Sequence, residues 1–177
     1  QGVHTGLPMM LAEEMEADWD LVRMEQAPAN ELFANDAVSK GFLLNGQRLS
    51  AILNPPADWA SYKLAQLLDV QTTGGSSSIR FTGEFGMRTA GAAVKEMLIK
   101  AAAEKWGVAE DDCVARLSHV THEKSGAKAS FGALAEAAAA FEPNATPTLK
   151  DKKDFTIIGT SKQRFDIPDK VRGAAVY

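Results

Sequence analysis

A run of two threonines, two glycines and three serines at residues 72–78 is followed directly by a long, alanine-rich helical pattern that extends to about Trp106. The first turn of a helix carries free N–H groups and about half a positive charge, which favours phosphate. The run therefore either holds the phosphate of a large cofactor or simply caps the helix, with Ser77 or Ser78 as N-cap. Because short motifs often match by chance, the run alone favours the cap.

Small residues and two arginines mark the first half of this helical pattern. A glycine inside a helix costs about 1 kcal/mol relative to alanine, so Gly83, Gly86 and Gly91 predict very close packing against other backbone. Arg80 and Arg88 lie where the helix dipole disfavours cations. They predict either a nearby anion or carboxylate partner, or an ordinary surface salt bridge.

Composition excludes several classes of protein. The 177 residues allow one domain or two small ones, and the formal net charge of −4, without basic runs interleaved with aromatics, argues against a nucleic-acid partner. The single Cys113 excludes an intrachain disulfide and a cysteine-ligated cluster built by this chain alone. No apolar run approaches the roughly 18 residues that a transmembrane helix needs.

The part before residue 72 predicts two helices and one strand. Apolar spacing predicts a helix over 7–19, alternation predicts a strand over 22–27, and a second amphipathic helix is expected over 59–68. The first helix has Leu7, Met10, Leu11 and Met15 on one face and Glu13, Glu14 and Glu16 mostly on the other. Residues 31–71 read as an insertion that either covers a functional surface and meets a partner, or is purely structural.

The part after the long helix predicts a small β-structure and one more helix. Gly107 is a plausible C-cap of the long helix. The elements expected after it are a strand over 114–121, a turn at 123–126, a return strand over 127–130, a helix over 130–141, a linker over 142–150, a strand over 155–159 and a connector over 164–173. Together these elements predict an α/β (α+β) fold, with helices packed on a small mixed sheet plus a β-hairpin.

The residues with reactive side chains do not form a recognisable catalytic set. His4 lies between glycines and could contact a ligand, but nothing pairs with it as a nucleophile. His119 and His122 are three apart on a predicted strand, so they point to opposite faces, make a poor metal pair and are expected to be exposed. Cys113 follows two aspartates, which raise rather than lower a thiol pKa. No nucleophile elbow surrounds 76–78. The sequence thus favours ligand binding over self-contained catalysis.

Several segments, taken in order, resemble a single family. They are residues 1–5, 7–14, 22–28, 73–78 and 88–93, and late in the chain 149–151, 155, 158–159, 164–168 and 170–173. The family is the molybdopterin-binding large subunit of the xanthine dehydrogenase/aldehyde oxidase superfamily. The branch it resembles is the isoquinoline oxidoreductase beta-subunit type, which includes bacterial membrane-associated aldehyde dehydrogenases and N-heterocycle hydroxylases.

The resemblance implies a cofactor, molybdopterin cytosine dinucleotide, and the residues that hold it. Gln1 and Gly2 match the segment that lies against the pterin, and 76–78 match a helix N-terminus that binds the phosphates. The implied cofactor-binding residues are Gln1, Gly2, His4, Thr73, Gly74, Gly75, Ser76, Ser77 and Ser78. No catalytic or metal-ligating residue is implied within the chain, because the family's glutamate base lies near the end of the full subunit, beyond residue 177.

The resemblance also implies a reaction and partners. Members oxidise an aldehyde to a carboxylic acid or hydroxylate an N-heterocycle, and electrons leave through 2Fe-2S clusters on a small subunit and, in some members, through haem c on a cytochrome subunit. The other expected partners are the remainder of the large subunit and a small-molecule substrate. The expected place is the periplasmic face of a bacterial inner membrane, reached through a partner subunit.

The resemblance further predicts how the chain is divided. Residues 1–142 would be part of the molybdopterin-binding domain, with 31–71 inserted, and 143–177 would lead into the next, hammerhead-like domain. The chain has no initiator Met and ends on the strand-like run 173–177, so we expect a segment of a longer polypeptide. The alternative from another class is a stand-alone, non-catalytic α/β module that binds a phosphate or nucleotide.

Overall fold

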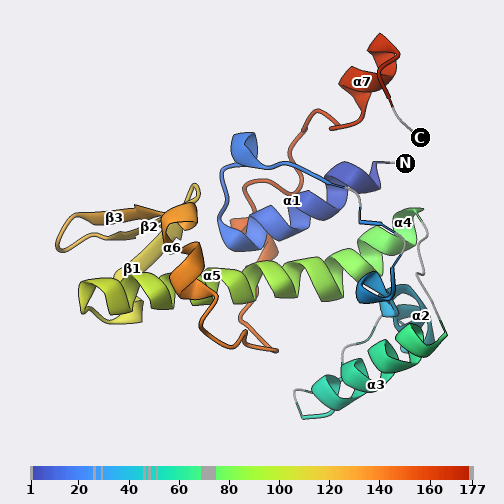
Figure 1. Cartoon of the computed structure of the whole chain (residues 1–177), viewed down its shortest axis with the longest axis horizontal. Coiled ribbons are helices and arrows are strands. Elements are labelled where there is room, and N and C mark those ends of the chain that lie inside the picture. The colour runs from blue at the N-terminus through green and yellow to red at the C-terminus, as the bar shows by residue number, and fades with distance from the viewer. Residues whose placement is uncertain are drawn as a thin grey trace. The chain divides into compact units, whose positions relative to one another are not determined.

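The structure is a computed structural model that describes residues 2–25, 27–28, 30–45, 47, 49–50, 52–68 and 75–175, without the side chains of Ser39 and Asn54. The chain has an α/β fold in which helices predominate (Figure 1). The described elements, in order, are α1 (Val3–Met15), η1 (Trp19–Leu21), η2 (Glu31–Phe33), α2 (Ala37–Leu43), α3 (Asn54–Leu67), α4 (Gly75–Ser78), η3 (Ile79–Met87), α5 (Arg88–Trp106), η4 (Glu110–Asp112), β1 (Cys113–Arg116), β2 (His119–His122), β3 (Ala127–Ser130), α6 (Phe131–Ala138), η5 (Lys152–Asp154) and α7 (Ile167–Arg172).

The chain divides into two compact units, each built from segments that are far apart in sequence. Unit 1 consists of Gln1–Pro8, Arg23–Met87 and Ser161–Tyr177, and unit 2 consists of Met9–Val22 and Arg88–Thr160. Among the helices that the structure describes, none has the length and apolarity needed to cross a membrane.

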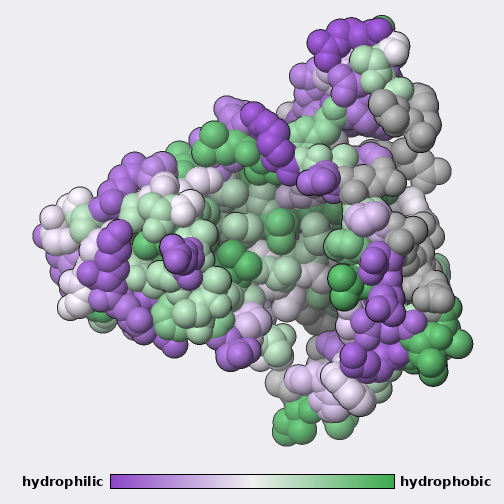
Figure 2. Space-filling view, in the orientation of Figure 1, coloured by the Kyte–Doolittle hydropathy of each residue, from purple (hydrophilic) through white to green (hydrophobic). Residues whose placement is uncertain are grey.

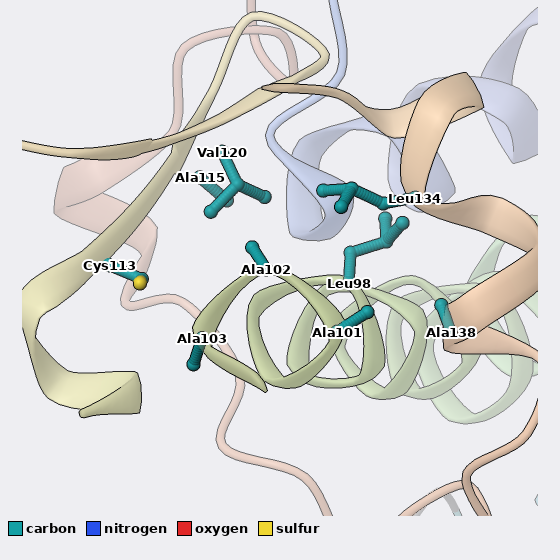
Figure 3. Packing of buried hydrophobic residues seen from close by; sticks show 9 residues of the cluster. All are labelled: Leu98, Ala101, Ala102, Ala103, Cys113, Ala115, Val120, Leu134 and Ala138. Atoms are coloured by element: carbon teal, nitrogen blue, oxygen red, sulfur yellow. The ribbon is translucent and has the colours of Figure 1, made fainter. Parts of the chain in front are cut away.

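Unit 2 is organised around α5, the long helix in Figure 1, with α6 and the three strands packed on its C-terminal half. Alanines line the buried face of α5, and their small side chains let α6 and the sheet approach closely. Figure 3 shows the resulting core, made of Leu98, Ala101, Ala102, Ala103, Cys113, Ala115, Val120, Leu134 and Ala138. The ends of the helices follow the sequence: Gly107 adopts a φ of 67° just after α5, and Ser130 Oγ accepts a hydrogen bond from Ala133 N–H as the N-cap of α6.

The described strands form one antiparallel sheet in the order β1-β2-β3, so the expected mixed sheet is wrong and the hairpin is part of this sheet. The single strand expected over 114–121 is two strands. They are joined by a two-residue turn in which Leu117 and Ser118 both have positive φ, at 47° and 60°. Tight hairpin turns require this backbone, usually with Asn or Gly. In this turn the backbone of Ser118 is held by residues outside the sheet: its N–H donates to Glu16 O (3.0 Å), and its Oγ accepts from Asp18 N–H (2.8 Å).

In unit 1, short helices enclose an aromatic group. The Phe81 ring is buried against Gly41, meets Phe42 edge-on at 5.1 Å and stacks on Phe85 at 6.3 Å between ring centroids. The helix expected over 59–68 is confirmed as α3, but it begins earlier, because prolines fit the first turn of a helix.

Unit 1 also exposes many large apolar side chains between residues 32 and 68. Figure 2 shows hydrophobic surface over the α3 region. The exposed side chains are Leu32, Phe33, Phe42, Leu43, Ile52, Leu53, Trp59, Leu64, Leu67 and Leu68. They belong to the segment 31–71, whose role as an insertion that meets a partner stays a prediction.

Two expected strands are not strands. Residues 22–25 and 27 have no regular structure, and residue 26 lies outside the described residues. Alternation alone is not enough when no described strand pairs with the segment. Residues 156–159 form bends and turns and 155 has no regular structure, because the N–H groups of 156–158 point at a side-chain carboxylate and not at a neighbouring strand. The strand-like run expected over 173–177 has no strand at 173–175, and 176–177 are outside the described residues.

Candidate functional site

The residues that the resemblance assigns to the cofactor are found in unit 1 where the structure describes them. Gln1, Thr73 and Gly74 lie outside the described residues. Gly2, with a φ of 83°, immediately precedes α1, and His4 is exposed in the first turn of that helix. Gly75, with a φ of 45°, opens α4. Both glycines adopt a backbone conformation that side chains disfavour, which suits a close approach of backbone to a ligand.

The three serines occupy the first helical turn and do not precede it. Ser76 is exposed, Ser77 is half-buried and Ser78 is buried, all within α4. The expectation that Ser77 or Ser78 is the N-cap is therefore wrong. The helix begins at Gly75, and α4, η3 and α5 follow one another directly to Trp106, as the sequence pattern predicts. An N-terminal turn of this kind offers N–H groups and hydroxyls to an anion.

The N-terminal turn of α1 and the start of α4 are neighbours within unit 1. A Cβ added to Gly6 would lie 2.7 Å from Ile79 Cδ1, so this turn of α1 contacts the residue that directly follows Ser78. Thr5 is buried beside it, and its Oγ1 accepts a hydrogen bond from Phe165 N–H at 3.0 Å. The two short segments that the sequence singled out, 2–4 and 75–78, are thus held near each other.

The helix continues from the serines as a π-helix over η3. Long π-helical stretches are rare, and shorter ones are frequent at functional sites. Arg80 lies in this stretch with its guanidinium 5.1 Å from the Phe81 ring centroid, a cation–π distance. The anion or carboxylate partner expected near Arg80 is not among the contacts that the described residues give it.

A second polar cluster lies in unit 2, and the sequence did not predict it. Glu13 and Glu14 of α1 are fully buried, although their helical position indicated a solvated face. Their partners come from α5 and from residues 150–158, more than 70 positions away in the chain. The only sequence signal was Arg88, for which the sequence left open either a nearby anion or carboxylate partner or an ordinary surface salt bridge. The first alternative is confirmed, since the buried Arg88 Nε donates to Glu14 Oε1 at 2.7 Å.

The cluster is neutralised internally. Burial by itself raises the pKa of the Glu13 carboxyl, but hydrogen bonds from Lys150 and from the N–H groups of Ile158, Thr156 and Ile157 outweigh it and lower the pKa. Burial by itself lowers the pKa of Lys150, but its hydrogen bonds to Glu13 and Glu16 outweigh burial, so the pKa of Lys150 is raised. Both groups are therefore charged at neutral pH. Because these charges already bind one another, the cluster serves the fold rather than a substrate.

The sheet carries two histidines, on opposite faces, and one buried cysteine. His119 and His122 point to opposite faces, as expected, but His122 is buried and not exposed; its Nδ1 lies 2.7 Å from Ser125 Oγ. In the part of the chain that the structure describes, no group of three His, Cys, Asp or Glu residues could hold a metal ion. Burial raises the pKa of the Cys113 thiol most, and Asp112 and Glu110 add to this effect. The predicted direction is confirmed, but of the two preceding aspartates only Asp112 contributes.

Cys113 is expected to be inert in the folded protein. Its thiol is buried and its pKa is raised, and the thiolate is the reactive form. With Ellman's reagent at neutral pH, the native chain should react only at the rate at which unit 2 opens. The same chain in denaturant should react at once, with its single thiol. A fast reaction of the native chain would contradict the burial of Cys113.

Comparison with known proteins shows that the relatives of this chain are oxidoreductases. No protein-family model matches the sequence. Curated proteins that align with the whole chain are oxidoreductases, so the chain is an α/β protein with oxidoreductase relatives. One is the "Isoquinoline 1-oxidoreductase subunit beta" of Brevundimonas diminuta, 27% identical over 210 aligned residues. Another is the "Membrane-bound aldehyde dehydrogenase (pyrroloquinoline-quinone)" of Gluconacetobacter polyoxogenes, 27% identical over 183. The chain spans only 23% and 19% of their respective lengths.

Proposed function

We propose that this chain is part of the cofactor-binding large subunit of a molybdenum hydroxylase that oxidises an aldehyde to a carboxylic acid or hydroxylates an N-heterocycle. The observation that carries the proposal is the alignment of the whole chain with two oxidoreductases, one named for isoquinoline and one for aldehydes. Because the chain spans about a fifth of these relatives, the proposal assigns the catalytic base to residues beyond the 177. These 177 residues would then bind and orient the cofactor.

The described residues fit a large anionic cofactor. Among the residues that the structure describes, none has an atom within 4 Å of a Cβ added at Gly2, which leaves room for a flat ring system against the backbone. Gly75 and the serine turn present N–H groups and hydroxyls suited to phosphates, and the Gly6–Ile79 contact keeps the two segments together. When bound, the molybdenum cofactor supplies the redox chemistry. The chain's own part is to hold the pterin near Gly2 and His4 and the phosphates near 75–78.

The same proposal covers the domains, partners and location. Residues 1–142 would belong to the cofactor-binding domain, with 31–71 inserted, and 143–177 would lead into the next domain. Electrons would pass to a 2Fe-2S subunit and from there to a c-type cytochrome at the periplasmic face of the membrane. The word "membrane-bound" in the name of the Gluconacetobacter relative supports a membrane-associated complex.

A second candidate is a quinone-linked aldehyde dehydrogenase. It is favoured by the name of the same relative, which includes pyrroloquinoline quinone. Elemental analysis of the intact purified complex, together with extraction of free quinone cofactor, separates the two. Molybdenum and iron stoichiometric with the subunits are expected. Absence of molybdenum with recovery of the quinone would replace the first candidate by the second, and absence of both would favour a non-catalytic phosphate-binding module.

A charge introduced at Ser77 tests the phosphate end of the site. Ser77→Asp in the full-length protein is expected to abolish cofactor loading, because a carboxylate in the first helical turn repels phosphate. Ser77 is the better position because Ser78 is buried, and a charge at Ser78 would also disturb the fold. Molybdenum content and the amount of cytosine nucleotide released on denaturation are the measurements.

Two controls accompany this variant. Ser77→Ala should retain most of the cofactor, because the N–H groups remain. Ser161→Asp adds the same charge at an exposed serine outside α4 and should load normally. Normal molybdenum content in Ser77→Asp would rule out phosphate binding at this turn.

A further inference from the structure

Residues 150–160, called the strap below, are attached to the rest of unit 2 mainly by one side chain, that of Glu13. The only regular structure in the strap is η5, a single 3₁₀ turn. Three consecutive N–H groups donate to the Glu13 carboxylate: Thr156 at 3.0 Å to each oxygen, Ile157 at 2.6 Å and Ile158 at 2.8 Å. Thr156 Oγ1 adds a longer bond of 3.3 Å. A run of N–H groups that converge in this way is an anion receptor, here filled by a carboxylate from α1.

The first residue of the strap binds the same carboxylate from the other side. Lys150 Nζ lies 2.6 Å from Glu13 Oε1 and 2.9 Å from Glu16 Oε1. Its N–H donates to Glu14 Oε2 at 2.9 Å, and its carbonyl accepts from Arg88 at 2.8 Å. The strap is therefore joined to α1 at Lys150 and again at 156–158 by charge-assisted hydrogen bonds, which are about twice as strong as neutral ones.

Apolar burial contributes little to the strap. Ile157 is its one buried residue, and 151–154 are all exposed. Phe155 is half-buried and lies with its ring centroid 5.2 Å from the Arg88 guanidinium. By contrast, α5, α6 and the sheet share a continuous apolar core. The strap thus depends mainly on charge and the rest of unit 2 mainly on apolar packing, so loss of the Glu13 charge should affect the strap alone.

We propose that the strap is closed by the negative charge of Glu13 and opens as a unit when that charge is removed, while α5, α6 and the sheet stay folded. Without the charge, three converging N–H groups lose their common acceptor and Lys150 loses its closest partner. A protonated carboxyl accepts far fewer of these bonds, and its own O–H faces donors. This conformational device is a property of the chain itself and does not depend on the proposed cofactor.

Acid is the natural trigger. Four charged groups among the described residues surround Glu13. Lys150 pairs with Glu13 and also with Glu16, and beside them Glu14 pairs with Arg88. The pKa of Glu13 is held below its ordinary value of 4.5, so its stabilising effect is present above that value and is lost as pH falls through the lowered pKa. The pKa of Lys150 is raised above 10.5, so its effect persists until strongly alkaline pH. The strap should be closed at neutral pH and open in acid.

Amide hydrogen exchange of the full-length protein tests this device without any mutation. As pH falls from neutral to below 4.5, the protection factors of residues 156–158 are expected to drop together, while the amides of β2 keep theirs. If 156–158 lose protection only together with β2, the strap has no opening of its own and the proposal is wrong.

A matched pair of variants isolates the charge at neutral pH. Glu13→Gln keeps the shape of the side chain and is expected to reduce protection at 156–158 by about tenfold or more, because hydrogen bonds to a charged acceptor are the stronger ones. Glu96→Gln is the control, since the Glu96 carboxylate holds Asn144 and Thr148 of the preceding linker at 3.0 and 3.3 Å. It should loosen the linker and leave 156–158 unchanged. Unchanged protection in Glu13→Gln would overturn the proposal.

Discussion

Replacing Arg88 with methionine is expected to lower the free energy of unfolding of unit 2 by about 3–5 kcal/mol, the usual cost of leaving a buried charge unpaired. Arg88 and Glu14 have side chains that are 6% and 0% exposed. Methionine fills much of the same volume but removes the bond to Glu14 and the second bond to the carbonyl of Lys150. Urea denaturation followed by circular dichroism measures the loss.

A double variant and a surface pair serve as controls for this prediction. Arg88→Met combined with Glu14→Leu removes both charges, so it should recover part of the stability that Arg88→Met alone loses. Lys153→Ala breaks the exposed pair with Asp151 and should cost no more than about 1 kcal/mol. If Arg88→Met were as mild as Lys153→Ala, the buried cluster would not be the polar interaction that secures α1.

Gly91→Ala is expected to destabilise unit 2 by about 1–3 kcal/mol, the range found for overpacked interiors. An added Cβ would lie 2.5 Å from Leu11 O and 3.0 Å from Glu14 Cβ. A backbone oxygen cannot swing away as a side chain can, so α1 must shift. That shift would also lengthen the Glu14–Arg88 bond. The cost should appear even though alanine is the better helix former.

Gly132→Ala is the matched control for Gly91→Ala. Gly132 lies in α6 of the same unit and has no atom within 4 Å of an added Cβ. The same change of residue should therefore be neutral or stabilise by up to about 1 kcal/mol. The melting temperature should thus fall for Gly91→Ala and stay unchanged or rise for Gly132→Ala. Equal shifts would mean that helix propensity, and not the contact with α1, decides both.

The parts of the fold that depend on local rules could be predicted from the sequence. The helix from the serines to Trp106, the Gly107 cap and the helix after Ser130 are all confirmed, because helical spacing and capping residues act within a few positions. The hairpin of β2 and β3, with its turn at 123–126, is confirmed. The turn between β1 and β2 was missed, since Leu117 and Ser118 lack the Asn or Gly that usually signals a tight turn. Their backbone is fixed by Glu16 and Asp18, just after α1 and about a hundred positions earlier.

Of the two polar sites, the one that depends on local residue types could be predicted from the sequence and the one that depends on distant partners could not. The glycines and serines at 75–78 were visible because their residue types signal a helix start and a ligand approach, although the exact first helical residue was not. The burial of Glu13 and Glu14 could not be predicted from helical position, since it depends on partners 74 to 145 positions away. The expected strand over 155–159 failed for the same reason, as its N–H groups bind a carboxylate and not a strand.

The bonds between Glu13 and residues 156–158 also have a consequence for folding kinetics. They join positions separated by 143 to 145 residues, whereas the antiparallel strand pairs and the contact of α5 with α6 are far more local. Long-range contacts form late, because the entropy of closing the chain must be lost before they stabilise anything. The three-stranded sheet, α5 and α6 should therefore assemble first. The packing of α1 and the ordering of the strap should be the last step.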